Sequence, residues 1–324
     1  MATNPDMNRS TRGQATPLEP LKERAASVSL EPPSLNYING LGARASVTGV
    51  IKDMAVFLDP EPASAVAYRV AARLAERWRA HLIAVFLVPD ISVNPWIRGK
   101  AIPEALDQYL EAVRQEEQDA RADFEKVCER HGIAGEWRSQ RIEPPEAVIV
   151  HARYAALSVV VRSDAEEAPL VGLPERLVLT SGRPTLLVPP TFDPEGLVGR
   201  RIVIAWNASQ EAARAVWDAM PLLSSADMVD VLIVDHDRYP DKFGEEPGAD
   251  LARHLARYGV EVNVRTISSN GGDVGRVLLD IATELPADLL VLGAYSHPRF
   301  TEAIFGGVTC RVLQEAKMPT LMSR

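Results

Sequence analysis

The chain has 324 residues, a formal net charge of −9, 46% hydrophobic residues and 24% charged residues, a balance typical of soluble globular proteins with more than one domain. The acidic balance argues against non-specific binding to nucleic acid, which depends on clustered Lys and Arg. No apolar run approaches the roughly 20 residues that span a bilayer, and residues 1–27 lack an apolar signal core. We therefore expect a cytoplasmic protein without a membrane segment. The two cysteines, Cys128 and Cys310, lie far apart in no metal-binding or CxxC spacing, which excludes a disulfide framework.

The N-terminal residues 1–48 are poor in large apolar side chains and carry no clear period, which predicts a disordered tail. The first domain is expected at residues 49–190. Its unbroken apolar run Leu82–Val88 is typical of a strand in a parallel sheet that helices cover on both faces. We predict strands at 54–58, 82–88, 138–142, 157–161 and 184–188, helices at 63–79, 103–131, 145–154 and 173–180, and an irregular loop at 90–102.

The pattern starts again after a linker at 191–199, which predicts a second domain at 200–324. Ser209 stands where a helix N-cap would be expected. The predicted strands are 201–206, 228–234, 260–267, 288–292 and 319–322, and the predicted helices are 210–223, 249–258, 273–284 and 307–315.

Alternation of strands and helices in both halves predicts an α/β fold with two doubly wound parallel-sheet domains in tandem, each with strand order 3-2-1-4-5. Several residues recur at matching places. The matched pairs are Asp59 with Asn207, Arg162 with Gly293, Gly172 with Gly307, Arg176 with Arg311, and Pro184-Thr185-Leu186 with Pro319-Thr320-Leu321. The last strands would be sheet edges, and exposed edges invite pairing. We therefore expect the two halves to pair there within one chain, and leave further homo-oligomers open.

A ligand of such a sheet binds outside the carboxyl ends of the strands, where the strand order reverses. In the second half that place is lined by Ala205-Trp206-Asn207 and by the segment that starts at Gly293. Gly306 and Gly307 precede a predicted helix. Adjacent glycines let backbone N–H groups approach an anion, and the helix N-terminus adds a favourable field. The segment 293–309 therefore predicts a phosphate site.

This segment resembles the phosphate loop of the universal stress protein family, whose pattern is G-x2-G-x9-G-[ST]. Gly293 and Gly306 match, Ser296 stands at the second glycine, and Gly307 replaces the Ser or Thr, with Thr309 close enough to compensate. The resemblance covers roughly residues 50–190 and 200–324. It implies a flavodoxin-like fold, frequent dimerisation through the last strand and, in some members, ATP bound without rapid hydrolysis. Asn207 stands where the ATP-binding members carry an acid that contacts the adenosine.

The resemblance implies an adenine nucleotide, ATP with or without Mg²⁺, in the second half only. The candidate cofactor-binding residues are Ala205, Trp206, Asn207, Val234, Gly293, Ser296, Arg299, Gly306, Gly307, Val308 and Thr309. In the first half, the acids Asp164, Glu166 and Glu167 would repel a phosphate, so we expect no nucleotide there.

Other features favour structural roles. Ser269-Asn270-Gly271-Gly272 reads as a turn with Asp273 as a helix cap, because the lysine of a P-loop is missing. The recurrent Arg176 and Arg311 favour a structural role at a helix start. His297 is interpreted as a solvated loop histidine. No catalytic residue and no metal-ligand set can be assembled from the spacing.

We therefore expect a regulatory protein of the stress response that binds ATP without efficient turnover. The alternatives are an interaction scaffold with two degenerate sites and a slow ATPase.

Overall fold

The computed structural model describes residues 51–88, 102–162, 172–294 and 307–324. The predicted tail at 1–48 and nearly all of the predicted loop at 90–102 lie outside these residues. None of the described helices is long and apolar enough to cross a membrane.

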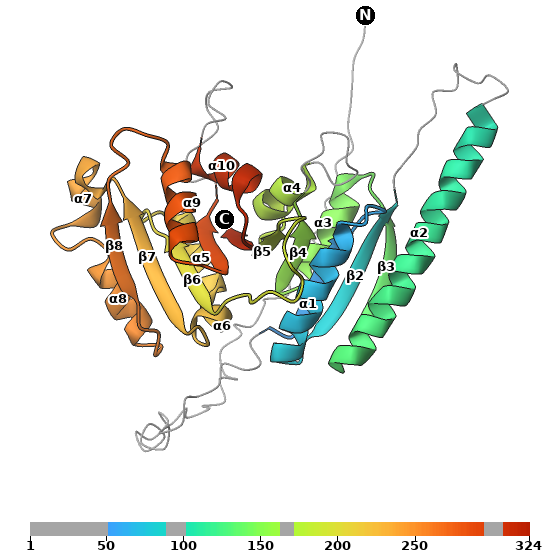
Figure 1. Cartoon of the computed structure of the whole chain (residues 1–324), viewed down its shortest axis with the longest axis horizontal. Coiled ribbons are helices and arrows are strands. Elements are labelled where there is room, and N and C mark those ends of the chain that lie inside the picture. Colours follow the sequence, from blue (N-terminus) through green and yellow to red (C-terminus); the bar gives the residue numbers. More distant parts are fainter. Residues whose placement is uncertain (1–50, 89–101, 163–171, 295–306) are drawn as a thin grey trace, which may run out of the picture. The chain divides into compact units, whose positions relative to one another are not determined.

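Strands and helices alternate through both halves (Figure 1). The first half contains β1 (Asp53–Leu58), α1 (Ser64–Trp78), β2 (His81–Val88), α2 (Ile102–His131), β3 (Gly135–Arg141), α3 (Pro145–Arg153), β4 (Leu157–Val161), α4 (Leu173–Thr180) and β5 (Thr185–Val188). The second half contains β6 (Arg201–Ala205), α5 (Gln210–Asp218), α6 (Met220–Leu223), β7 (Met228–Val234), η3 (His236–Arg238), α7 (Pro240–Phe243), α8 (Ala249–Ala256), β8 (Asn263–Ile267), α9 (Val274–Glu284), β9 (Leu289–Gly293), α10 (Val308–Glu315) and β10 (Thr320–Ser323).

The strands form one ten-stranded sheet with the order β3-β2-β1-β4-β5-β10-β9-β6-β7-β8. Each half therefore has the expected order 3-2-1-4-5, and every pair within a half is parallel. Right-handed crossovers place α1 and α2 on one face and α3 and α4 on the other, and α1 indeed packs against α2 and α3 against α4. The fold is the predicted pair of doubly wound domains.

The two halves meet at their last strands, as the sequence predicts. β5 and β10 pair in antiparallel register, and Leu321 lies opposite Leu186. These two leucines are the matched residues of the repeated Pro-Thr-Leu, so a local two-fold axis passes between them. A second link is the Arg162 guanidinium, which donates to the carbonyl oxygen of Ala316 at 2.5 Å.

Burial explains which strands the sequence reveals. The central strands β4, β5, β9 and β10 are mostly apolar and carry no exposed side chain, and β1 and β2 continue this pattern after a polar first residue. β3 and β8 lie at the two ends of the sheet and carry polar, largely exposed side chains. Both were predicted with wrong starts: β3 begins at Gly135 rather than 138, and β8 begins at Asn263 rather than 260. An edge strand needs no continuous apolar run, so its first and last residues are hard to predict from the sequence.

The predicted helix 210–223 is two helices. α5 ends at Asp218, and α6 begins at Met220 with Pro221 in its first turn. Proline has no N–H and its ring crowds the preceding turn, so a continuous helix is disfavoured at this position.

The linker between the halves lies along α1. Arg73 of α1 donates to the carbonyl oxygens of Pro194 and Gly196 at 2.8 and 2.6 Å. At its end, the Asp288 carboxylate accepts the backbone N–H groups of Gly199, Arg200 and Arg201. The linker is therefore held in its middle and at its end by charge-assisted hydrogen bonds.

The register of the sheet corrects one match between the halves. Val161 lies opposite Val188 of β5, and Gly293 lies opposite Ser323 of β10, which occupies the matching place. Gly293 therefore corresponds to Val161, whereas the sequence analysis paired it with Arg162. Arg162 corresponds to Ala294: their backbone N–H groups donate to the equivalent carbonyls of Val188 and Ser323. The proposed pairing was wrong by one residue because the sequence does not display strand register.

Candidate functional site

The carboxyl ends of β6 and β9 lie side by side, because Ala205 pairs with Leu292, the residue before Gly293. Trp206 follows β6 and donates its backbone N–H to the carbonyl oxygen of Leu232 at 2.9 Å. Asn207 is exposed, and its Oδ1 accepts the N–H of Ser209 at 3.1 Å. The structure thus brings the expected residues of β6 and β9 together at the reversal of strand order.

Ser209 begins α5. Its side-chain oxygen accepts the backbone N–H of Ala212 at 3.1 Å, which confirms the predicted N-cap. The turn made by Asn207 and the cap made by Ser209 fix the direction in which the chain leaves β6. Asn207, which follows the end of β6, therefore helps to hold the start of α5.

Gly293 lies against the backbone of α5. A Cβ atom at this position would lie 2.3 Å from the backbone nitrogen of Ala212 and 2.4 Å from the carbonyl carbon of Glu211. Backbone atoms of a packed helix cannot move aside as a side chain can, so only glycine fits. The glycine that the sequence analysis assigned to phosphate binding has a packing role that sequence reasoning did not foresee.

Gly307 stands at the start of α10. It is exposed, has the extended φ of −107°, and a Cβ atom there would meet no atom of the described residues within 4 Å. Neither strain nor crowding requires glycine at this position. Because Gly307 has no side chain, it cannot cap the N–H groups of the first turn, whose residues include the half-buried Val308 and the buried Thr309. The anion site predicted at this helix start therefore stays a prediction.

Arg311 does not serve as a spare phosphate ligand. Its guanidinium pairs with Asp273 at 3.1 Å and with Glu315. Arg276 of α9 pairs with the same Glu315 at 2.7 Å. The Asp273 carboxylate also caps α9 by accepting the N–H of Arg276 at 2.8 Å, a bond that lowers its pKa. The predicted cap and the predicted structural role of Arg311 are both confirmed.

Asp235 is a further polar group at these strand ends. It follows Val234, the half-buried last residue of β7, and adopts the left-handed φ of 54°. Its carboxylate accepts both the hydroxyl and the N–H of Ser269 at 2.6 Å, and these bonds lower its pKa. Asp235 thus ties the end of β7 to the turn after β8. The described residues contain no group of three or more His, Cys, Asp or Glu side chains arranged to hold a metal ion.

Part of the expected site cannot be placed. Ser296, Arg299 and Gly306, together with His297, lie outside the described residues. The described candidates come from the ends of β6, β7 and β9 and from the start of α10.

The matching place in the first half is built differently. Asp59, which corresponds to Asn207, is 5% exposed, and its carboxylate accepts the hydroxyl of Ser64 and the N–H of Glu61 at 3.1 Å. Burial raises the pKa of Asp59. Gly172, before α4, has a φ of +75°, which favours glycine for conformational reasons that do not apply to Gly307. The acids Asp164, Glu166 and Glu167 lie outside the described residues.

Comparison with known proteins agrees with this architecture. Residues 199–324 match the model of the Universal stress protein family. A universal stress protein from Archaeoglobus fulgidus DSM 4304 superposes with a TM-score of 0.61 at 15% identity, over 83% of this chain and 98% of that chain. A protein of unknown function from Pseudomonas aeruginosa PAO1 superposes with a TM-score of 0.51 at 13% identity, over 85% of this chain and 92% of that chain. The comparison with curated proteins finds no match.

The reversal of strand order between β6 and β9 places the second half in the class of doubly wound α/β domains. Residues 199–324 form a domain of the universal stress protein family.

Proposed function

We propose that this chain is a stress-response regulatory protein whose C-terminal half binds ATP or another adenine nucleotide without efficient turnover. The observation that carries the proposal is the start of α10, where the exposed Gly307 provides no side-chain cap for the first-turn N–H groups and no described atom lies within 4 Å of its Cβ position. A phosphate at that place would lie at the positive end of the helix dipole, and Gly307 has no side chain to block its approach.

The rest of the nucleotide would extend along the ends of β6 and β7. Trp206 is half-buried and offers a flat apolar surface beside a base. Asn207 offers an amide for hydrogen bonds, without the charge of the acid that some family members carry. The first half contributes no site in this proposal, because Asp59 is buried and already bonded to Ser64.

The proposal is tested by calorimetric titration of the full chain with ATP and Mg²⁺. Gly307→Leu should leave the fold intact, because a Cβ atom at this exposed position would meet no atom of the described residues within 4 Å, and should weaken ATP binding at least tenfold by covering the backbone N–H groups. The matched control is Gly172→Asn at the equivalent place in the first half, since Asn tolerates a positive φ better than other residues do. ATP binding should be unchanged in this control.

A reverse variant sharpens the test. Gly307→Ser restores the family pattern and adds a hydroxyl that both caps α10 and reaches a phosphate, so ATP affinity should rise. Absence of ATP binding in the wild-type chain and in Gly307→Ser would refute the proposal.

One observation favours the interaction scaffold as a second candidate. Gly293 is required for packing against α5 whether or not a nucleotide binds, so its presence is explained without a ligand. If the chain is such a scaffold, titration with ATP should give no heat of binding, either for the wild type or for Gly307→Leu. Release of inorganic phosphate from bound ATP, measured over hours, distinguishes a slow ATPase from a non-hydrolysing binder.

A further inference from the structure

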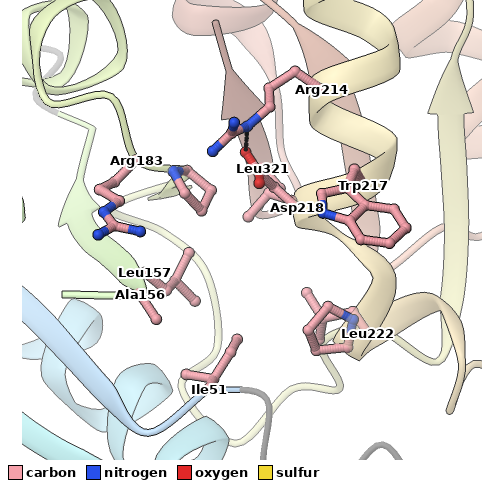
Figure 2. Close-up of a pocket in the computed structure, with 11 residues that line it drawn as sticks. Ile51, Ala156, Leu157, Arg183, Arg214, Trp217, Asp218, Leu222 and Leu321 are labelled. Atoms are coloured by element: carbon pink, nitrogen blue, oxygen red, sulfur yellow. Dashed lines mark hydrogen bonds and ion pairs between the residues drawn. The ribbon is translucent and has the colours of Figure 1, made fainter. Parts of the chain in front are cut away.

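A cavity of about 210 Å³ lies between the two halves of the sheet. We propose that it binds a small organic anion with a flat apolar body, such as an aromatic carboxylate. None of its lining residues belongs to the candidate nucleotide site, so the two proposals are independent. Figure 2 shows that its walls come from both halves, with Arg183 on one side and Arg214, Asp218 and Trp217 of α5 on the other.

The floor of the cavity is apolar. Ile51 and Leu157 contribute from the first half, and Leu222 and Leu321 from the second. All four side chains are buried in the fold and line the bottom of the cavity. Apolar groups that enter such a space leave water at a gain of about 25 cal/mol for each Å² that they bury. The floor therefore favours a ligand with an apolar body.

The rim carries a net positive charge. The Nε atom of Arg214 donates to Asp218 at 2.8 Å, which neutralises one arginine and holds its guanidinium in place. The Nε atom of Arg183 donates to the carbonyl oxygen of Arg153 at 3.2 Å. Among the described residues, no acid pairs with Arg183. Two guanidinium groups and one carboxylate thus leave one positive charge for an anion, and guanidinium binds carboxylates in paired hydrogen bonds.

Trp217 supplies a flat wall. Its side chain is 54% exposed, which is unusual for so large an apolar group, and its ring meets Tyr258 edge-on with centroids 5.8 Å apart. A flat ring in the cavity would cover part of this indole and change its fluorescence. Trp217 is thus both a wall of the site and a reporter of its occupation.

The size of the cavity limits the ligand. Pockets for drug-sized molecules measure roughly 300–1,000 Å³, and 210 Å³ is below this range. At about 30 Å³ of liquid volume for each water molecule, the cavity corresponds to several waters. An aromatic ring with one carboxylate is of this order. Because such a ligand touches both halves, its binding would stabilise their junction by mass action.

The test uses the full chain and three probes of one shape and different charge: benzoate, benzamide and benzylamine. Trp217 fluorescence should report saturable binding of benzoate at roughly millimolar concentration or below, about tenfold weaker binding of benzamide, and no binding of benzylamine. Trp217→Phe removes the signal and identifies its source, and calorimetry then measures benzoate binding to that variant.

Two substitutions locate the site. Arg183→Gln should weaken benzoate binding about tenfold, because it removes the charge and part of the donor set. Ala156→Leu should abolish binding by filling the cavity, and circular dichroism should show an unchanged fold, since Ala156 is only half-buried. The matched control is Arg176→Gln, an exposed arginine of the same half that does not line the cavity. It should bind benzoate as the wild type does.

The proposal is overturned if benzoate shows no binding at roughly 10 mM, a concentration well above the expected dissociation constant. It is also overturned if the three probes bind equally, or if both Arg183→Gln and Ala156→Leu leave the benzoate affinity unchanged. Saturating ATP separates this site from the nucleotide proposal: benzoate affinity should be the same with and without it, so either proposal can fail alone.

Discussion

Replacing Gly293 by alanine tests whether the phosphate-loop glycine also holds the fold together. The added Cβ atom would lie 2.3 Å from the nitrogen of Ala212 and 2.7 Å from its Cα atom. Ordinary contacts for such atoms begin near 3.4 Å, so α5 and β9 must separate by about 1 Å. Overpacking of this kind costs about 1–3 kcal/mol, and the upper part of the range applies here because the clashing atoms belong to the backbone.

Urea denaturation followed by circular dichroism measures this loss. Gly293→Ala should lower the free energy of unfolding by about 2–3 kcal/mol. Gly307→Ala provides the comparison: its Cβ atom would meet nothing within 4 Å, and its stability should stay within about 0.5 kcal/mol of the wild type. A Gly293→Ala variant as stable as Gly307→Ala would refute the packing argument.

Three further substitutions test the charges at the strand and helix ends. Burial raises the pKa of Asp59, so the folded chain binds its proton more tightly than the unfolded chain does, and ionisation weakens folding at neutral pH. Asp59→Asn, the residue of the second half, should therefore increase the free energy of unfolding at pH 7. This gain should shrink as the pH falls through the raised pKa and vanish below the ordinary pKa of an aspartate. Asp273→Ala should cost about 1 kcal/mol by removing the cap of α9. Because the pKa of Asp273 is lowered in the fold, that cost should fade in urea titrations as the pH drops through the lowered value; a constant cost would contradict the capping role. Asp288→Ala should cost about 2 kcal/mol, because it leaves the N–H groups of Gly199, Arg200 and Arg201 without their acceptor, and the exposed Asp227→Ala should change stability little in the same assay.

The arrangement of the sheet could be predicted from the sequence because its central strands are nearly continuous apolar runs. β2 and β7 are examples in which burial on both faces leaves an apolar signal in nearly every residue. β3 and β8 could not be bounded in the same way, because edge strands keep polar residues on exposed faces. The break between α5 and α6 had a visible signal in Pro221, which should have ended the predicted helix.

The candidate site was only partly predictable. The strand ends that carry Asn207 and Gly293 could be found from the order of elements, since ligands bind where that order reverses. The close contact between Gly293 and the backbone of α5 could not be predicted, because it depends on how α5 crosses β9 after folding. The same holds for the cavity near Trp217 and Arg183, whose residues lie far apart in the sequence and meet only through the pairing of β5 with β10.

That pairing also changes the conditions under which the two halves remain together. The linker along α1 joins them covalently, so β5 meets β10 at an effective concentration of order millimolar, whatever the concentration of the protein. Dilution cannot separate the halves, and their ratio is always one to one. The first half can therefore lack the glycine loop in its own sequence and still cover the β10 edge of the second half. The second half is the one in which an exposed glycine precedes α10.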